Sequence, residues 1–115
     1  MRRLALPFAL VALLGLAGCG SSEATAPASP RQDPHAMVAE GATLLDVRTP
    51  GEFSSGHLEG AVNIPVQELD RRIEEVPTDH SVVVYCASGM RSANAARTLR
   101  SRGYTVHDLG PMSAW

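Results

Sequence analysis

The chain has 115 residues, which is enough for one folded domain, and its formal net charge at pH 7 is only −2. This near balance of acidic and basic residues gives no indication of a nucleic-acid partner or of a strongly acidic surface. Binding to nucleic acid is therefore not expected.

The first segment of the chain is typical of an export signal. Two arginines precede an almost wholly apolar stretch, 4–17, which is short for a membrane span. The stretch ends in Leu16-Ala17-Gly18-Cys19, which is similar to a bacterial lipobox. That resemblance implies a lipoprotein signal peptide over 1–18 and a lipid on Cys19 that anchors the exported protein to a membrane, facing the periplasm or the cell exterior. An ordinary secretory signal or an uncleaved anchor are the alternatives.

The next segment separates the signal from the folded part. Residues 20–33 are rich in serine, alanine and proline and show no hydrophobic periodicity, so 19–33 is interpreted as a lipidated, flexible tether. The remaining residues, 34–115, are interpreted as one domain. We expect it to act as a monomer.

Apolar runs alternate with helical patterns through the domain. A helix is predicted from Pro34 to near Gly41, with Asp33 as its cap. The further expected elements are strands at 43–47, 61–64, 81–85 and 105–109, a helical turn at 50–53, and helices at 66–76 and 92–102. This alternation predicts an α/β fold of three layers, in which helices cover both faces of a central, mostly parallel sheet.

The most informative stretch is the hexapeptide that begins at Cys86. Cys86 ends a buried strand, and a helical pattern begins soon after, so its thiol is expected where the backbone N–H groups of a helix N-terminus converge. This environment lowers the pKa of a cysteine and makes the thiolate a nucleophile. Arg91 adds a guanidinium that can grip an oxyanion. We interpret the loop as an active site.

The number of cysteines supports this interpretation. The chain has two cysteines, and an exported protein would ordinarily pair them in a disulfide. A lipidated Cys19 cannot pair, which leaves Cys86 as a lone thiol in an oxidising compartment. A catalytic role for Cys86 therefore explains this lone thiol better than a purely structural role in the core.

Three segments together resemble the rhodanese (sulfurtransferase) family. They are Asp46–Phe53, with the pattern D-V-R-x-x-x-E-F, Gly56–Pro65, with G-H-x-x-G-A-x-N-I-P, and Cys86–Arg91, with C-x-x-G-x-R. The resemblance implies that the Cys86 thiolate takes the outer sulfur of a donor such as thiosulfate, forms a persulfide, and passes the sulfur to a thiol or to cyanide. It also implies that no metal or organic cofactor is needed.

Each residue of the loop has an expected role. Cys86 is the expected nucleophile, Arg91 is expected to hold an anionic donor, and Gly89 is expected to adopt a positive φ or to allow close approach. Ser88 and Ser92 are expected mainly to cap the helix. The expected substrate-binding set is Ala87, Ser88, Gly89, Met90, Arg91 and Ser92. Many family members have arginine where this chain has Ala87, which favours a bulkier or neutral donor, or a protein persulfide.

Other polar residues are given structural roles. Asp46, at the end of the first predicted strand, is expected to order its own loop, with tuning of the thiolate as the alternative. Arg48 and Glu52 are expected to form an ion pair. His57 is not expected to act as a base, and no histidines lie at the spacing of metal ligands.

Two other functions remain as alternatives. A cysteine-dependent phosphatase or arsenate reductase would use a similar loop, but those enzymes wrap their oxyanion in a longer loop than the four residues between Cys86 and Arg91. A rhodanese-like binding module without turnover is the other alternative. It is disfavoured because this chain keeps the cysteine.

Overall fold

The structure is a computed structural model that describes residues 33–115. The predicted signal peptide, Cys19 and the predicted tether up to residue 32 lie outside the described residues. Across residues 33–115, no helix is both long enough and apolar enough to cross a membrane.

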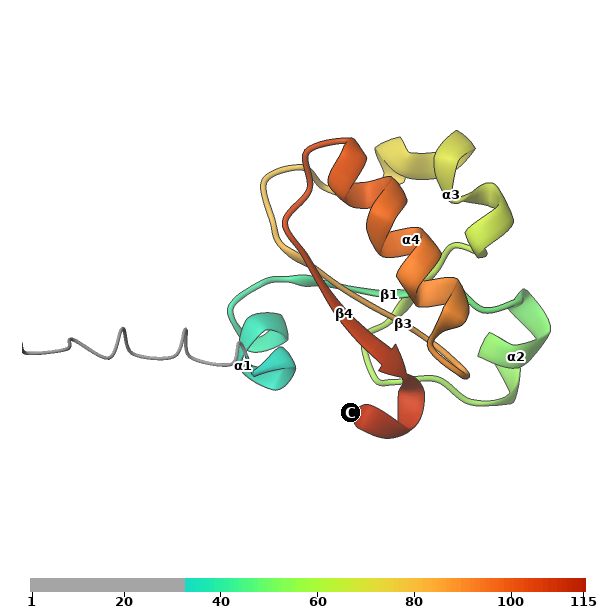
Figure 1. Ribbon diagram of the computed structural model, residues 1–115. Coiled ribbons are helices and arrows are strands. Elements are labelled where there is room, and N and C mark those ends of the chain that lie inside the picture. Colours follow the sequence, from blue (N-terminus) through green and yellow to red (C-terminus); the bar gives the residue numbers. More distant parts are fainter. Residues whose placement is uncertain (1–32) are drawn as a thin grey trace, which may run out of the picture.

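The described residues form one four-stranded, all-parallel sheet in the order β2-β1-β3-β4 (Figure 1). The α/β class and the parallel sheet predicted from the sequence are thus confirmed. In chain order the elements are α1 (Pro34–Ala39), β1 (Thr43–Asp46), α2 (Pro50–Ser55), β2 (Val62–Asn63), α3 (Val66–Arg72), the 3-10 turn η1 (Ile73–Glu75), β3 (Val82–Cys86), α4 (Met90–Ser101), β4 (Val106–Pro111) and the 3-10 turn η2 (Met112–Ala114).

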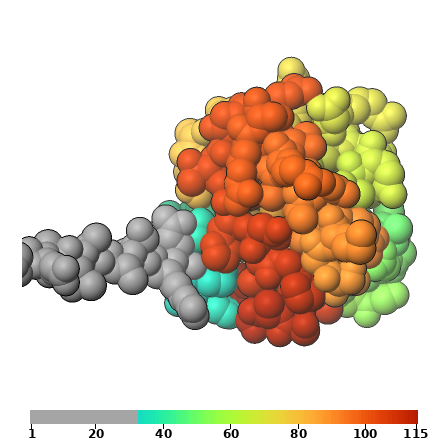
Figure 2. Space-filling model, in the orientation of Figure 1, coloured from blue at the N-terminus to red at the C-terminus, as the bar shows by residue number. Residues whose placement is uncertain are grey.

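The two faces of the sheet carry separate parts of the core. On one face α3 and α4 cover the sheet, and on the other lie α1 and η2 (Figure 1). All five residues of β3 are buried, because this strand lies between two neighbours and beneath both helical layers. In the space-filling view, α4 (orange) and the C-terminal segment (red) lie next to each other on one side of the molecule (Figure 2).

The end of the chain packs onto the smaller part of the core. Trp115 is partly buried against the cluster of Leu44, Val83 and Tyr85, and its ring lies 3.9 Å from that of His35, centroid to centroid. Its contacts are those of a residue that covers the core.

Several boundaries differ from the predictions. The helix α4 begins at Met90, two residues before the predicted Ser92, because Gly89 adopts a left-handed conformation that ends the loop early. The predicted turn at 50–53 is the helix α2, which extends to Ser55. The predicted helix at 66–76 ends at Arg72 and continues as the turn η1.

Candidate active site

The site lies at the carboxyl edge of the sheet. Cys86 is the last residue of β3, and β1, the neighbouring parallel strand, ends at Asp46, which pairs with Tyr85. Because parallel strands end at the same edge, the loop after β1, the helix α2 and the loop after Cys86 all meet there. Residues that are 39 positions apart in the chain, Glu52 and Arg91, consequently come into contact.

The loop after Cys86 is shaped by Gly89. This residue has φ 101° and ψ −15°, a left-handed conformation that side chains other than glycine rarely adopt, as predicted from the sequence. The turn directs the Gly89 N–H at the Cys86 Sγ, with 2.9 Å between nitrogen and sulfur. The first turn of α4 follows directly. The sulfur therefore lies at the end of the helix where N–H groups are not used by the helix itself.

The electrostatics of the loop favour the thiolate. Burial acts to raise the pKa of the Cys86 thiol, but hydrogen bonds from the Ser92 hydroxyl and from the backbone N–H groups of Ser92, Gly89 and Ser88 outweigh it. The pKa of Cys86 is lowered as a result. The hydrogen bonds that Arg91 donates to Glu52 are the main cause that raises the pKa of its guanidinium, and the nearby Cys86 sulfur adds to this effect.

The thiol is enclosed, whereas the loop around it is open to solvent. Cys86 has 0% exposed surface, but Ala87 and Ser88 are exposed and Met90 is 77% exposed. Cys86 is a free cysteine in the described part of the chain.

The serines do not cap α4 as predicted. Gly89 occupies the N-cap position without a side-chain bond, which places Ser88 before the cap and Ser92 inside the first turn. The Ser92 hydroxyl, fully buried, donates to the Gly89 carbonyl oxygen at 3.0 Å. This hydroxyl has one proton, so it donates either to that carbonyl or to the Cys86 sulfur.

Arg91 is held by a carboxylate. Its Nη1 lies 2.6 Å from the Oε1 of Glu52, and its Nη2 lies 3.0 Å from Oε2, a bidentate ion pair between α4 and α2. The predicted ion pair of Arg48 with Glu52 is wrong, because Arg48 bonds to Asp46 instead. Hydrogen bonds from Arg91, with a further one from the Thr49 backbone, lower the pKa of Glu52 to about 2.

Asp46 and Arg48 form a buried pair beneath the site. The Nη2 of Arg48 lies 2.6 Å from the Oδ2 of Asp46, and Asp46 also accepts the backbone N–H of Arg48 at 2.9 Å. Arg48 donates further to the Gly56 carbonyl oxygen at 2.7 Å and lies over the Tyr85 ring. The side chain of Asn63 donates to the carbonyl oxygens of both Asp46 and Arg48. These bonds hold the loop that follows β1.

Tyr85 and His57 extend this framework. The Tyr85 hydroxyl accepts the backbone N–H of Leu58 at 3.1 Å, and burial raises the pKa of Tyr85 to about 12. His57 stacks on Phe53 with ring centroids 3.7 Å apart, and its Nδ1 lies 2.9 Å from the Phe53 carbonyl oxygen. Among residues 33–115, no group of three or more histidine, cysteine or acidic side chains is arranged to hold a metal ion.

Sequence reasoning missed the role of Glu52. A signal for its position was present, because Thr49 followed three residues later by Glu52 is a capping box with Pro50 at the first helical position. That pattern predicts a helix that begins at Pro50 and a Glu52 side chain that is held at the start of this helix. It does not predict the distant arginine that Glu52 binds.

Comparison with known proteins places this geometry in a family. The model of the rhodanese-like domain matches residues 31–115. An uncharacterized protein of Bacillus subtilis, YqhL, is 50% identical over 76 residues, which cover 64% of this chain. The thiosulfate sulfurtransferase PspE of Escherichia coli is 40% identical over 63 residues, 53% of this chain. The matched regions span 60% of the length of YqhL and 61% of that of PspE.

The solved structures show the same similarity. A structure described as rhodanese with anions from E. coli superposes with a TM-score of 0.60 and 34% sequence identity. The match covers 64% of this chain and 91% of that one.

Proposed function

Since this chain belongs to the rhodanese-like domain family, we propose that it is a sulfurtransferase in which Cys86 carries a sulfane sulfur between a donor such as thiosulfate and a thiol or cyanide acceptor. One observation carries the proposal: the Cys86 sulfur accepts the Gly89 N–H at 2.9 Å beside the first turn of α4. The lowered pKa of this thiol supports a nucleophile that is present as thiolate to a greater extent than an ordinary cysteine.

The proposed reaction needs two steps. The Cys86 thiolate attacks the outer sulfur of thiosulfate, an S–S bond forms, and the bond within thiosulfate breaks, with sulfite leaving with the electron pair. An acceptor thiolate then attacks the outer sulfur of the persulfide and releases the Cys86 thiolate. The loop N–H groups stabilise the negative sulfur in both states, so no general base is required.

A mass measurement tests this function. The full chain with Cys19→Ser, in which Cys86 is the remaining thiol, should gain the mass of one sulfur atom after thiosulfate and lose it after cyanide. Hydrolysis of an aryl phosphate should be negligible in the same preparation. Cys86-dependent phosphatase turnover would contradict the proposal, and a chain that never gains sulfur from any sulfane donor would favour a binding module.

We also propose that the protein is attached to a membrane by a lipid on Cys19. Support comes from the Leu16-Ala17-Gly18-Cys19 pattern at the end of the apolar stretch. Palmitate supplied to expressing cells should label the wild-type chain. Cys19→Ser should abolish labelling and leave an unprocessed precursor, whereas label that persists in this variant would rule out the assignment.

A further inference from the structure

The charge of Arg91 is cancelled where an anionic donor would need it. Glu52 binds both terminal nitrogens of the guanidinium, which are the groups that would otherwise hold a sulfonate. Arg48, the guanidinium close enough to repel Arg91, is itself bound by Asp46. Arg91 and Arg48 are each bound by a carboxylate and therefore offer little net positive charge to a donor that approaches the Cys86 thiolate.

Glu52 is fixed in this position by its own helix. The Thr49 backbone N–H donates to the Oε1 of Glu52 at 3.3 Å, and the Thr49 hydroxyl oxygen accepts the Glu52 backbone N–H at 3.2 Å. Because the carboxylate is already oriented, its bidentate bond to Arg91 loses little side-chain entropy. A donor anion would have to displace an aligned carboxylate and would form the same kind of bonds in its place.

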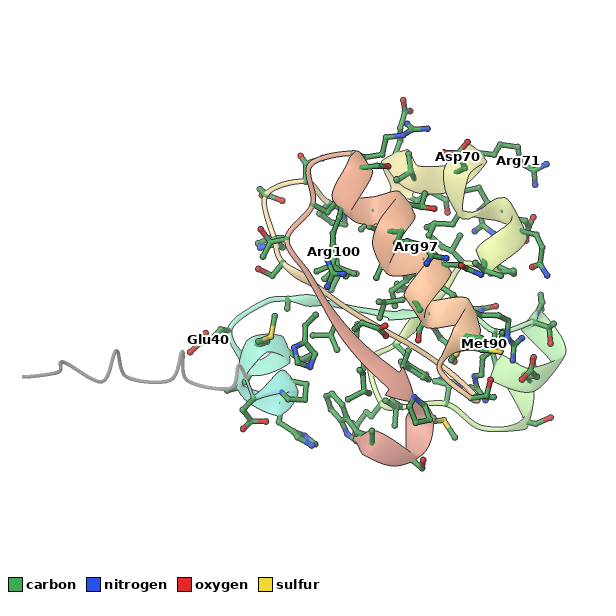
Figure 3. All side chains as sticks on the ribbon, viewed as in Figure 1. Glu40, Asp70, Arg71, Met90, Arg97 and Arg100 are labelled. Atoms are coloured by element: carbon green, nitrogen blue, oxygen red, sulfur yellow. The ribbon has the colours of Figure 1, made fainter. Side chains whose placement is uncertain are left out.

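The rim of the site is uncharged, and its largest exposed side chain is the apolar Met90. The exposed residues that follow Cys86 are Ala87 and Ser88 in the loop and Met90 at the start of α4, and none of the three bears a charge. Figure 3 shows the Met90 side chain at the start of α4, at the carboxyl edge of the sheet. A donor with an organic group can contact this rim, whereas inorganic thiosulfate brings a double negative charge and no apolar surface.

From these contacts we propose that Glu52 determines donor specificity: by neutralising Arg91, it favours organic sulfane-sulfur donors with a single negative charge, such as an aryl thiosulfonate, over thiosulfate. This inference rests on the proposed function. In the step concerned, the Cys86 thiolate attacks the sulfane sulfur of the thiosulfonate. The new S–S bond forms as the bond to the sulfonyl sulfur breaks, and a sulfinate leaves with the electron pair.

Two alkylating reagents of nearly equal shape test the charge directly. Iodoacetate is an anion and iodoacetamide is neutral, and both are expected to alkylate Cys86 in the full chain with Cys19→Ser. Glu52→Gln keeps the capping box, because glutamine serves at that position. It should raise the rate ratio of iodoacetate to iodoacetamide by about tenfold, the effect of one charge at a partly solvated site. The increase should shrink at high salt.

Matched variants separate the local charge from other causes. Arg91→Ala should lower the ratio, and the double variant Glu52→Gln, Arg91→Ala should return it toward the wild-type value. Glu52→Asp keeps the charge on a shorter side chain and should raise the ratio less than Glu52→Gln does. Glu40→Gln removes the same charge on the far side of the molecule from Met90 (Figure 3) and should leave the ratio unchanged. An unchanged ratio in Glu52→Gln, or an equal change in Glu40→Gln, would overturn the proposal. If Glu52 only stiffened the loop, both reagents would react faster to the same degree.

The sulfur donors give the second measurement. In Glu52→Gln, the rate of Cys86 loading from thiosulfate should rise about tenfold relative to loading from benzenethiosulfonate. An unchanged preference between the two donors would overturn the specificity role. Failure of the wild type to load from either donor would instead refute the sulfurtransferase function, and the alkylation ratios would still decide the charge effect of Glu52.

Discussion

Replacing Cys86 with serine is expected to abolish sulfur loading completely. An alcohol is not ionised near pH 7, and its oxygen cannot carry a sulfane sulfur, so both steps of the proposed reaction lose their central atom. The wild-type loading rate should fall as the pH drops through the lowered pKa of the thiol, because only the thiolate attacks. Intact mass after incubation with a sulfane donor, at several pH values, measures both effects.

Two variants on α4 serve as references for this experiment. Ser92→Ala removes a hydroxyl that helps to lower the pKa of Cys86 and should shift the loading profile to higher pH without abolishing loading. Ser101→Ala lies at the other end of the helix, is exposed, and should load like the wild type. Sulfur retained by Cys86→Ser would show that another residue carries it.

The fold was predictable because its signals are local. The four apolar strand patterns and the helices between them are each read within a short window of sequence, and the parallel sheet follows from their alternation. The boundaries were less predictable where glycine decided them. Gly89 starts α4 at Met90 through a left-handed turn, although the alanine-rich pattern alone suggested Ser92.

The site was only partly predictable, because Glu52 binds a residue 39 positions away in the chain and not its neighbour Arg48. Spacing along the chain suggested Arg48 with Glu52, but the end of β1 directs Arg48 back to Asp46, and the end of β3 brings Arg91 to Glu52. Sequence distance cannot rank such partners when two acidic and two basic residues meet at one edge. The positive φ of Gly89 was predictable, since a tight turn before a helix limits the choice of residue.

Removal of the Asp46 carboxylate is expected to be the most destabilising single change in this framework. Asp46 has 0% and Arg48 7% of its side chain exposed, and Asp46→Ala would leave the guanidinium buried without its counter-charge. Breaking such a pair costs about 3–5 kcal/mol, which is a large part of the stability of a small domain. Urea unfolding of Asp46→Ala should therefore show a much lower midpoint than that of the wild type, and part of the variant protein should already be unfolded at low urea concentrations.

Other variants distinguish the lost pair from a general sensitivity to mutation. Arg71→Ala breaks an ion pair with Glu68 in which the arginine side chain is 75% exposed, and it should change the free energy of unfolding by about 1 kcal/mol or less (Figure 3). The double variant Asp46→Leu, Arg48→Met replaces both charges with apolar groups and should recover much of the stability lost in Asp46→Ala. If Asp46→Ala were no more destabilising than Arg71→Ala, the buried pair would not be what holds the loop after β1. Glu52 and its helix α2, which follow that loop, would then need another source of order.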